Sequence, residues 1–286
     1  MKELAITHPD KVLDAESGMT KRSLAEYYDA IADHLLPHIA NRPLSVVRCP
    51  SGSDKPCFFQ KHVGRGVPDG VKTVVIKNQE SGEMEDFLTV NSSEGLVGLA
   101  QMSVLEIHPW GSRNDSLDKP DRVVFDLDPD LSIEWKALAE TAQKLKMRLS
   151  RVGLKSFLKS TGGKGLHVVI PIRPEHEWPA VKQFAHEIVL EMEHAQPDLY
   201  VTKMTKTVRK NHIYLDYLRN DRESTSIAPF SPRARPGTPV AVPLQWTELD
   251  SAKAPAFHVP DFARWKTRLR NDPWRKLPET DQRLPS

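Results

Sequence analysis

The chain has 286 residues, of which 39% are hydrophobic and 27% are charged, and its formal net charge is +2. These values are typical of a folded globular protein and exclude a disordered or uniformly basic chain, so any surface for nucleic acid must be local. No apolar run approaches the ~18 residues of a membrane span, and the first residues lack the apolar core of a secretory signal. We therefore expect a cytoplasmic protein that does not contact a membrane.

The chain contains two cysteines, Cys49 and Cys57. Two cysteines eight positions apart match neither a disulfide framework nor the spacing of a zinc site. Because disulfides are rare in the cytosol, the sequence predicts that both residues are reduced thiols.

The first third of the chain combines helices with short strands. Apolar residues at helical spacing predict an amphipathic helix over 20–40, with Thr20 as its N-cap. Further along, the pattern predicts an extended segment at 44–60, strands at 72–77 and 86–90, and an apolar stretch at 94–107 that begins as a helix.

Strands alternate with helices in the middle of the chain. The expected order is strand 122–127, helix 134–152, strand 155–160, a glycine turn, strand 166–172, helix 179–194 and strand 212–218. This alternation predicts a mixed α/β or α+β domain. The tail after about residue 232 is rich in proline and shows fewer periodic segments.

An acidic cluster follows an apolar run at 124–130, which reads Val-Phe-Asp-Leu-Asp-Pro-Asp. On a strand, Asp126 and Asp128 would point to one face while Phe125 and Leu127 point into the core. Paired carboxylates suit a hard divalent cation such as Mg²⁺ or Mn²⁺. An ordinary solvated turn after a strand explains Asp-Pro-Asp equally well. We assign Asp130 to the turn rather than to a metal.

A glycine-rich turn at 161–165 joins two predicted strands and is followed by His167. Glycines let backbone N–H groups approach a phosphate, and Lys164 adds a positive charge. The alternative is a tight hairpin whose glycines only supply positive φ angles. The turn lacks the spacing of a P-loop. Together with the acids upstream, it forms a candidate metal–phosphate site.

Asp216 lies within the apolar strand 212–218. A buried carboxylate without a partner is costly, so it needs either an arginine or the same metal ion. Basic residues are frequent between 203 and 222, which fits either a solvated face or a local basic surface.

Several motifs in this order resemble those of a known family. Val-Phe-Asp-Leu-Asp-Pro at 124–129, Gly-Gly-Lys-Gly-Leu-His at 162–167 and Tyr-Leu-Asp-Tyr at 214–217 resemble the archaeo-eukaryotic primase superfamily. More narrowly, the chain is similar to the polymerase domain of bacterial DNA ligase D. The similarity extends through 7–13, 56–59, 105–110 and 227–237, so it covers nearly the whole chain.

The resemblance implies an α+β, two-lobed primase-polymerase fold with a mostly antiparallel, RRM-like catalytic sheet flanked by helices. Residues 1–286 would form a single catalytic domain. Its approximate parts would be an N-terminal α/β lobe at 1–110, a catalytic lobe at 111–250 and a C-terminal tail at 251–286.

The activity implied by the resemblance is template-directed nucleotidyl transfer, which would fill gaps and extend ends during double-strand break repair by non-homologous end joining. The enzyme would use two Mn²⁺ or Mg²⁺ ions and NTP or dNTP substrates, with a preference for ribonucleotides. Asp126, Asp128 and Asp216 would be the metal ligands and catalytic residues. The nucleotide would be bound by Thr161, Gly162, Lys164, His167, Arg233, Arg209 and His108.

The resemblance also assigns DNA contacts. Phe58 and Phe59 would stack on template bases, and Lys11 and Lys21 would hold a downstream 5′-phosphate. Without the resemblance, the two aromatics would be one core residue beside one partly exposed residue, and the lysines would be surface residues. The implied partners are DNA with gaps or 5′-phosphorylated broken ends, the Ku protein and a DNA ligase, which places the protein at the nucleoid.

Two departures from the family pattern stand out. Ser160-Thr161 replaces the usual Thr-Ser before the glycines, which keeps a hydroxyl at 161 but puts its geometry in doubt. Ligase D proteins usually carry ligase and nuclease modules as well, so this chain is either a stand-alone polymerase or one domain of a longer protein.

Two other functions remain as alternatives. The first is a non-catalytic module that binds and bridges DNA ends. The second is a phosphatase of the haloacid dehalogenase type, in which the first aspartate of such a motif is a nucleophile. That fold expects a parallel sheet, and Pro129 and the glycine turn fit its pattern poorly.

Overall fold

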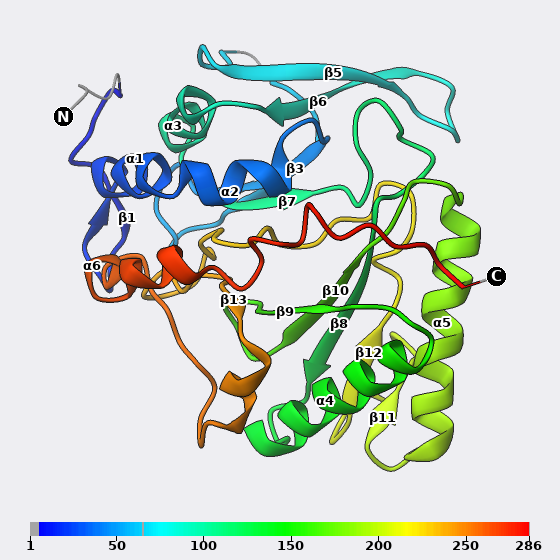
Figure 1. The fold of residues 1–286 in the computed structure, drawn as a ribbon. Coiled ribbons are helices and arrows are strands. Elements are labelled where there is room, and N and C mark those ends of the chain that lie inside the picture. Colours follow the sequence, from blue (N-terminus) through cyan, green and yellow to red (C-terminus); the bar gives the residue numbers. More distant parts are fainter. Residues whose placement is uncertain (1–5, 65, 286) are drawn as a thin grey trace. The chain divides into compact units, whose positions relative to one another are not determined.

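The computed structural model describes residues 6–64 and 66–285. The chain divides into two units, each with its own main sheet (Figure 1). The first unit comprises Met1–Trp110, Ile227–Ala241 and Phe257–Arg270, and the second comprises Gly111–Ser226, Val242–Ala256 and Asn271–Ser286. After residue 226 the chain thus returns twice to the first unit, which differs from a division into contiguous lobes.

The first unit contains a five-stranded antiparallel sheet in the order β4-β3-β6-β5, with β7 also paired to β3. Its helix α3 contacts α1, β5 and β7. The elements are β1 (Val12–Asp14), β2 (Met19–Thr20), α1 (Lys21–Ala30), α2 (Ala32–Ile39), β3 (Leu44–Arg48), β4 (Phe58–Gln60), β5 (Val71–Lys77), β6 (Met84–Val90), α3 (Ser93–Gln101), β7 (Val104–Pro109) and α6 (Phe262–Trp265). A 3-10 helix, η2 (Lys266–Asn271), follows α6.

The first helical segment begins at its predicted cap. The Thr20 side chain accepts a hydrogen bond from the Ser23 N–H, and the Ser23 side chain bonds back to the Thr20 backbone, which forms a capping box. The helix predicted over 20–40 is divided into α1 and α2, because Ile31 adopts φ −101° and ψ 2° between them.

Cys49 and Cys57 form a disulfide, so the prediction of two reduced thiols is wrong. The strand register explains the pairing. Strands β3 and β4 are antiparallel, and Arg48 lies opposite Phe58. The next pair along the same register is 49 and 57, and their Cα atoms are 4.5 Å apart. A spacing of eight residues therefore marks the two ends of a loop that joins paired strands.

The second unit contains a six-stranded sheet in the order β11-β12-β8-β10-β9-β13. Every pairing is antiparallel except that of β11 with β12. The elements are β8 (Arg122–Pro129), α4 (Trp135–Arg151), β9 (Phe157–Ser160), β10 (Leu166–Pro171), α5 (Trp178–Ala195), β11 (Tyr200–Val201), β12 (Ile213–Asp216), β13 (Pro243–Leu244) and the 3-10 helix η1 (Trp246–Asp250). This mostly antiparallel sheet confirms the α+β expectation and contradicts the parallel sheet of a dehalogenase-type phosphatase.

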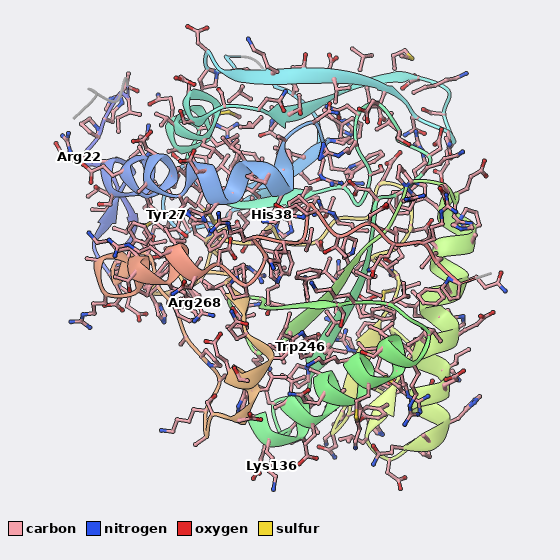
Figure 2. The ribbon with its side chains drawn as sticks, in the orientation of Figure 1. Arg22, Tyr27, His38, Lys136, Trp246 and Arg268 are labelled. Carbon is pink, nitrogen blue, oxygen red and sulfur yellow. A yellow bond between two sulfur atoms is a disulfide. The ribbon has the colours of Figure 1, made fainter. Side chains whose placement is uncertain are left out.

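Helices and the end of the chain cover the two faces of this sheet. Helices α4 and α5 pack against β8, and α4 also packs against β10 (Figure 1). Trp246 lies beside α4, where the Lys146 ammonium is 4.8 Å from its ring centre (Figure 2). On the other face, Trp274 and Leu277 bury against Val124. None of the described helices combines the length and apolar character needed to cross a membrane.

Candidate active site

Strand β8 separates its acidic residues from its apolar ones. Phe125 and Leu127 are fully buried, while Asp126 and Asp128 are partly exposed on the opposite face. The predicted alternation is therefore confirmed. It follows from the period of two along a strand, because the helices α4 and α5 require one apolar face.

The neighbouring strands align further polar side chains with Asp126. Asp216 of β12 lies directly opposite Asp126 on one side, and His167 of β10 lies directly opposite on the other side. Lys159 of β9 is the register partner of His167. We call these four residues, which lie in one line across four strands, the polar row. Asp128 lies two positions along β8 on the same face, opposite Tyr214.

Arginines neutralise the three carboxylates. The Arg219 guanidinium bridges two of them: Nε is 3.1 Å from Asp216 Oδ2, and Nη2 is 3.3 Å from Asp126 Oδ2. Arg209 forms an ion pair with Asp128. The Leu218 N–H also donates to Asp216 Oδ1 at 2.8 Å. Of the two sequence-derived explanations for Asp216, the structure contains the arginine.

The surroundings of the two central acids shift their pKa values in opposite directions. Burial alone would raise the pKa of Asp126, but His167, Arg219 and Lys159 hold it well below its ordinary value. The pKa of Asp216 is raised, first by burial and then by the charge of Asp126, against the effect of Arg219. The pKa of His167 is lowered to about 4 by burial and by Lys159, although Asp126 opposes this shift. At neutral pH, His167 is thus a neutral imidazole beside an ionised carboxylate.

The donor chemistry of this face fits a hard divalent cation. Asp126, Asp128 and Asp216 offer carboxylate oxygens on one face of the sheet, and such ligands are preferred by Mg²⁺ and Mn²⁺. With the arginines in place, the described residues include no group of three or more His, Cys, Asp or Glu side chains arranged around a metal position. A bound cation would have to take the place that the guanidinium groups now hold.

The glycine turn lies against β8 next to these acids. A Cβ atom added to Gly165 would lie 2.7 Å from the Leu127 carbonyl oxygen, so only glycine allows this approach. The Thr161 hydroxyl donates to the Gly165 carbonyl oxygen at 3.1 Å, which closes the turn. Gly162 adopts φ +67°, and Lys164 is exposed.

A second group of predicted residues gathers in the first unit around Glu106. The Glu106 Oε1 atom accepts hydrogen bonds from Arg233 Nε at 3.0 Å and from the Ala234 N–H at 2.9 Å. Its Oε2 atom is 2.8 Å from His108 Nε2. We call Glu106, His108 and Arg233 the Glu106 cluster. Burial would raise the pKa of Glu106, but its bonds to His108 and Arg233 lower it to about 2.

Sequence reasoning did not single out Glu106. Its signal is the one that identified Asp216, namely a carboxylate inside an apolar strand, here β7. Such a residue must have a buried partner. The same reasoning applied to 104–109 would have indicated that Glu106 has a partner, but not that the partners are His108 and Arg233.

The predicted stacking residues are exposed on β4. Phe58 and Phe59 are 45% and 50% exposed, which is far more than their size would allow in a core. The Arg48 guanidinium lies 5.4 Å from the Phe58 ring centre, and the His108 ring meets the Phe59 ring edge-on at 5.8 Å. Phe59 therefore adjoins the Glu106 cluster.

Lys11 and Lys21 line one cavity of about 430 Å³ together with His8, Pro9 and Asp10. Lys21 is buried, its Nζ donates to the Thr7 carbonyl oxygen at 3.0 Å, and burial and Lys11 lower its pKa. Two lysines and a histidine around one small cavity suit a phosphate group. His8 is a residue that the sequence reasoning did not assign.

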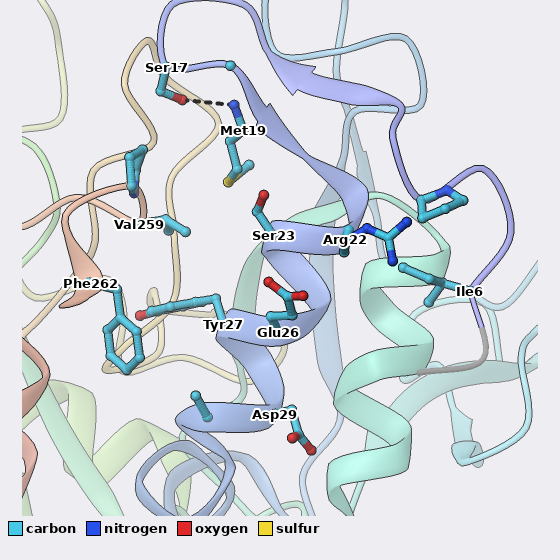
Figure 3. Close-up of a pocket in the computed structure, with 14 residues that line it drawn as sticks. Ile6, Ser17, Met19, Arg22, Ser23, Glu26, Tyr27, Asp29, Val259 and Phe262 are labelled. Carbon is cyan, nitrogen blue, oxygen red and sulfur yellow. Dashed lines mark hydrogen bonds between the residues drawn. The ribbon is translucent and has the colours of Figure 1, made fainter. Parts of the chain in front are cut away.

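The predicted residues thus fall into three groups. The second unit carries Asp126, Asp128, Asp216, Thr161, Gly162, Lys164, His167 and Arg209, and the first unit carries His108 and Arg233 with Phe58 and Phe59, and separately Lys11 and Lys21. A further cavity of about 1050 Å³ beside α1, with Tyr27 and Phe262 in its wall, involves none of them (Figure 3).

The chain matches the family model described as LigD, primase-polymerase domain, over residues 20–274. It is 36% identical over 281 residues to the multifunctional non-homologous end joining protein LigD of Pseudomonas aeruginosa, covering 98% of this chain and 33% of that protein. It is 32% identical over 261 residues to the bifunctional non-homologous end joining protein LigD of Bacillus subtilis, covering 91% of this chain and 41% of that protein. The chain thus spans between a third and two fifths of these relatives.

A solved structure shares the fold. The polymerase domain from Mycobacterium tuberculosis ligase D, in complex with DNA, superimposes with a TM-score of 0.89 at 29% sequence identity. The match covers 98% of this chain and 99% of that chain. The likeness therefore includes the main sheets of both units.

Proposed function

Since the chain belongs to the LigD primase-polymerase domain family, we propose that it is a template-directed nucleotidyl transferase that fills gaps and extends ends during non-homologous end joining. The observation that carries this proposal is the polar row. Asp126 and Asp216 are register partners on the adjacent strands β8 and β12, and Asp128 and the glycine turn lie beside them. A fold alone does not require three acids and a glycine-rich turn on one partly buried face of a sheet.

In the proposed reaction, Asp126, Asp128 and Asp216 would hold two Mn²⁺ or Mg²⁺ ions, which activate the primer 3′-hydroxyl and neutralise the leaving pyrophosphate. Thr161, Gly162 and Lys164 would orient the triphosphate through backbone N–H groups and one ammonium. Neutral His167 can donate a hydrogen bond to a phosphate or sugar oxygen without adding charge. Arg209, Arg233 and His108 would complete the nucleotide contacts.

The substrates would be NTPs or dNTPs, with ribonucleotides preferred, as in the family that the chain resembles. Phe58 and Phe59 are both exposed on the edge strand β4, where either ring can stack on a template base. The cavity of His8, Lys11 and Lys21 would hold the 5′-phosphate on the far side of a gap. The protein would then act on DNA at the nucleoid, in the cytoplasm. Its partners would be Ku and a DNA ligase.

A primer-extension assay tests the proposal. A gapped duplex with a 5′-phosphate and a labelled primer is incubated with Mn²⁺ and either NTPs or dNTPs. We expect extension by the wild type and none by Asp126→Asn. Asp130→Asn is the matched control, because Asp130 accepts hydrogen bonds from Ser132 in a turn and lies outside the polar row.

The assay also separates the alternatives. Extension by Asp126→Asn at the wild-type rate would refute the proposed site. Tight binding of the gapped duplex without any extension by the wild type would instead support a non-catalytic module that bridges ends. The ribonucleotide preference fails separately if dNTPs are incorporated faster than NTPs.

A further inference from the structure

Arg219 is a residue of the site that neither the motifs nor the predicted nucleotide contacts include. It follows the end of β12 by three positions. Its Nε binds Asp216 at 3.1 Å and its Nη2 binds Asp126 at 3.3 Å, so a single guanidinium joins the two acids. The planar fork of arginine suits such a bridge, whereas lysine offers a single point charge.

The two acids need this cation because of their register. Asp126 and Asp216 are direct cross-strand partners, and the Cβ atoms of such pairs are about 4.5–5.5 Å apart. Like charges at this distance on a partly buried face repel strongly. The remaining contacts of Asp216 include the Leu218 N–H at 2.8 Å, which solvates one oxygen but supplies no full charge.

The guanidinium is bound by these acids alone. Within residues 6–64 and 66–285, Arg219 makes no hydrogen bond or ion pair except with Asp126 and Asp216. Its side chain is 41% exposed, so it can swing into solvent without breaking another contact. Arg222 on the same loop differs, because it is 13% exposed and pairs with Asp118 and Glu223.

We propose that Arg219 is an internal counter-ion that holds Asp126 and Asp216 together in the metal-free protein and is displaced when a divalent cation binds. The inference rests on the proposed function, in which the same carboxylates are metal ligands. Arginine and metal then compete for the same oxygens, so each lowers the apparent affinity of the other. Arg219 is a positioning residue, and its effect should appear in metal affinity before any nucleotide is present.

Direct titration with Mn²⁺ tests the competition. Free Mn²⁺ is counted by electron paramagnetic resonance as the ion is added to the full chain without nucleotide. We expect Arg219→Gln to lower the dissociation constant at least about fivefold. The dissociation constant of Arg219→Lys should lie between those of the wild type and Arg219→Gln. That of Arg222→Gln should match the wild type. An unchanged or weaker affinity in Arg219→Gln overturns the proposal.

Thermal unfolding supplies a second readout that does not depend on activity. Without metal, Arg219→Gln should melt about 2–4 °C below the wild type, because the acids lose their counter-ion. Saturating Mn²⁺ should abolish this difference, since the ion then neutralises the acids in both proteins. An equal difference with and without Mn²⁺ would mean that Arg219 is merely structural and would overturn the proposal.

Failure of this inference is distinguishable from failure of the proposed function. If wild-type extension requires Asp126 but Arg219→Gln binds Mn²⁺ no more tightly, only the counter-ion role is wrong. If Asp126→Asn extends primers normally, the acids are not the catalytic ligands and both proposals fall.

Discussion

The Glu106 cluster of the first unit and the polar row of the second unit both place carboxylates inside apolar strands, but they neutralise them differently. Glu106 is held by Arg233, His108 and a backbone N–H, and the Arg233 side chain is only 17% exposed. Asp126 and Asp216 share one arginine that is 41% exposed and makes no other described ion pair. Glu106 is neutralised by partners that are largely buried, whereas Asp126 and Asp216 are neutralised by Arg219, which can move into solvent.

This contrast indicates what a ligand site requires beyond charge. A closed cluster positions His108 and Arg233, and its carboxylate oxygens are already committed to these partners. In the polar row, by contrast, Asp126 and Asp216 share one arginine that can exchange with a cation, because its side chain is 41% exposed. The difference predicts that mutations in the two regions will affect different measurements.

The largest effect should follow Asp216→Asn in the polar row. Loss of one metal ligand should slow primer extension by about 10²–10³-fold, because a metal ion supplies several kcal/mol of transition-state stabilisation. The free energy of unfolding should change little, since the substitution also removes the repulsion from Asp126. Single-turnover extension and urea unfolding on the same preparations measure the two effects. A large loss of stability would show that Asp216 belongs with Glu106 rather than in a ligand site.

Glu106→Gln, unlike Asp216→Asn, should lower the free energy of unfolding. Removal of this charge breaks the ion pair of Glu106 with Arg233, and breaking a buried pair costs about 3 kcal/mol. Urea unfolding should record this as a lower midpoint. Glu248→Gln is a control, because Glu248 caps the exposed helix η1 of the second unit. A loss of less than about 1 kcal/mol would place the cluster among ordinary surface ion pairs.

The pH dependence of stability should separate the two regions further. The folded-state pKa of Glu106 is lowered to about 2 from its ordinary value of 4.5, so the unfolded chain binds the proton more tightly. Its stabilising contribution is therefore complete above about pH 4.5 and is lost as the pH falls towards 2. The difference in unfolding free energy between the wild type and Glu106→Gln should shrink across this range. A constant difference would contradict the lowered pKa.

Phe59→Ala should give the smallest effect. The Phe59 ring adjoins His108 but is half exposed, so its removal should leave stability nearly unchanged. Loss of one stacked base should weaken binding of the gapped duplex by about 1–2 kcal/mol. Fluorescence anisotropy at fixed salt measures this, with Val75→Ala as a control at another exposed apolar position of the same unit. Equal affinities of the two variants for the duplex would show that Phe59 does not contact DNA.

Local patterns were sufficient to predict parts of both regions. The alternation of Phe125, Asp126, Leu127 and Asp128 is a property of one strand, and the cap at Thr20 depends on neighbours three residues apart. Both are therefore readable from the sequence, as are most strand and helix positions.

Features that depend on strand register could not be predicted from the sequence. The position of Asp216 opposite Asp126, the bridge made by Arg219 and the disulfide of Cys49 with Cys57 all require knowledge of which strands pair and in what register. The bond from Glu106 to Arg233 joins residues 127 positions apart. No local period encodes such a contact, although a carboxylate in an apolar strand signals that a partner must exist.

The central claim is that Asp126, Asp128 and Asp216 form a divalent metal centre. The most direct measurement is the number of Mn²⁺ ions bound per chain in the presence of a non-hydrolysable nucleoside triphosphate. We expect two ions for the wild type and fewer than one for Asp126→Asn, with Asp130→Asn equal to the wild type. Two ions bound with wild-type affinity by Asp126→Asn would contradict it.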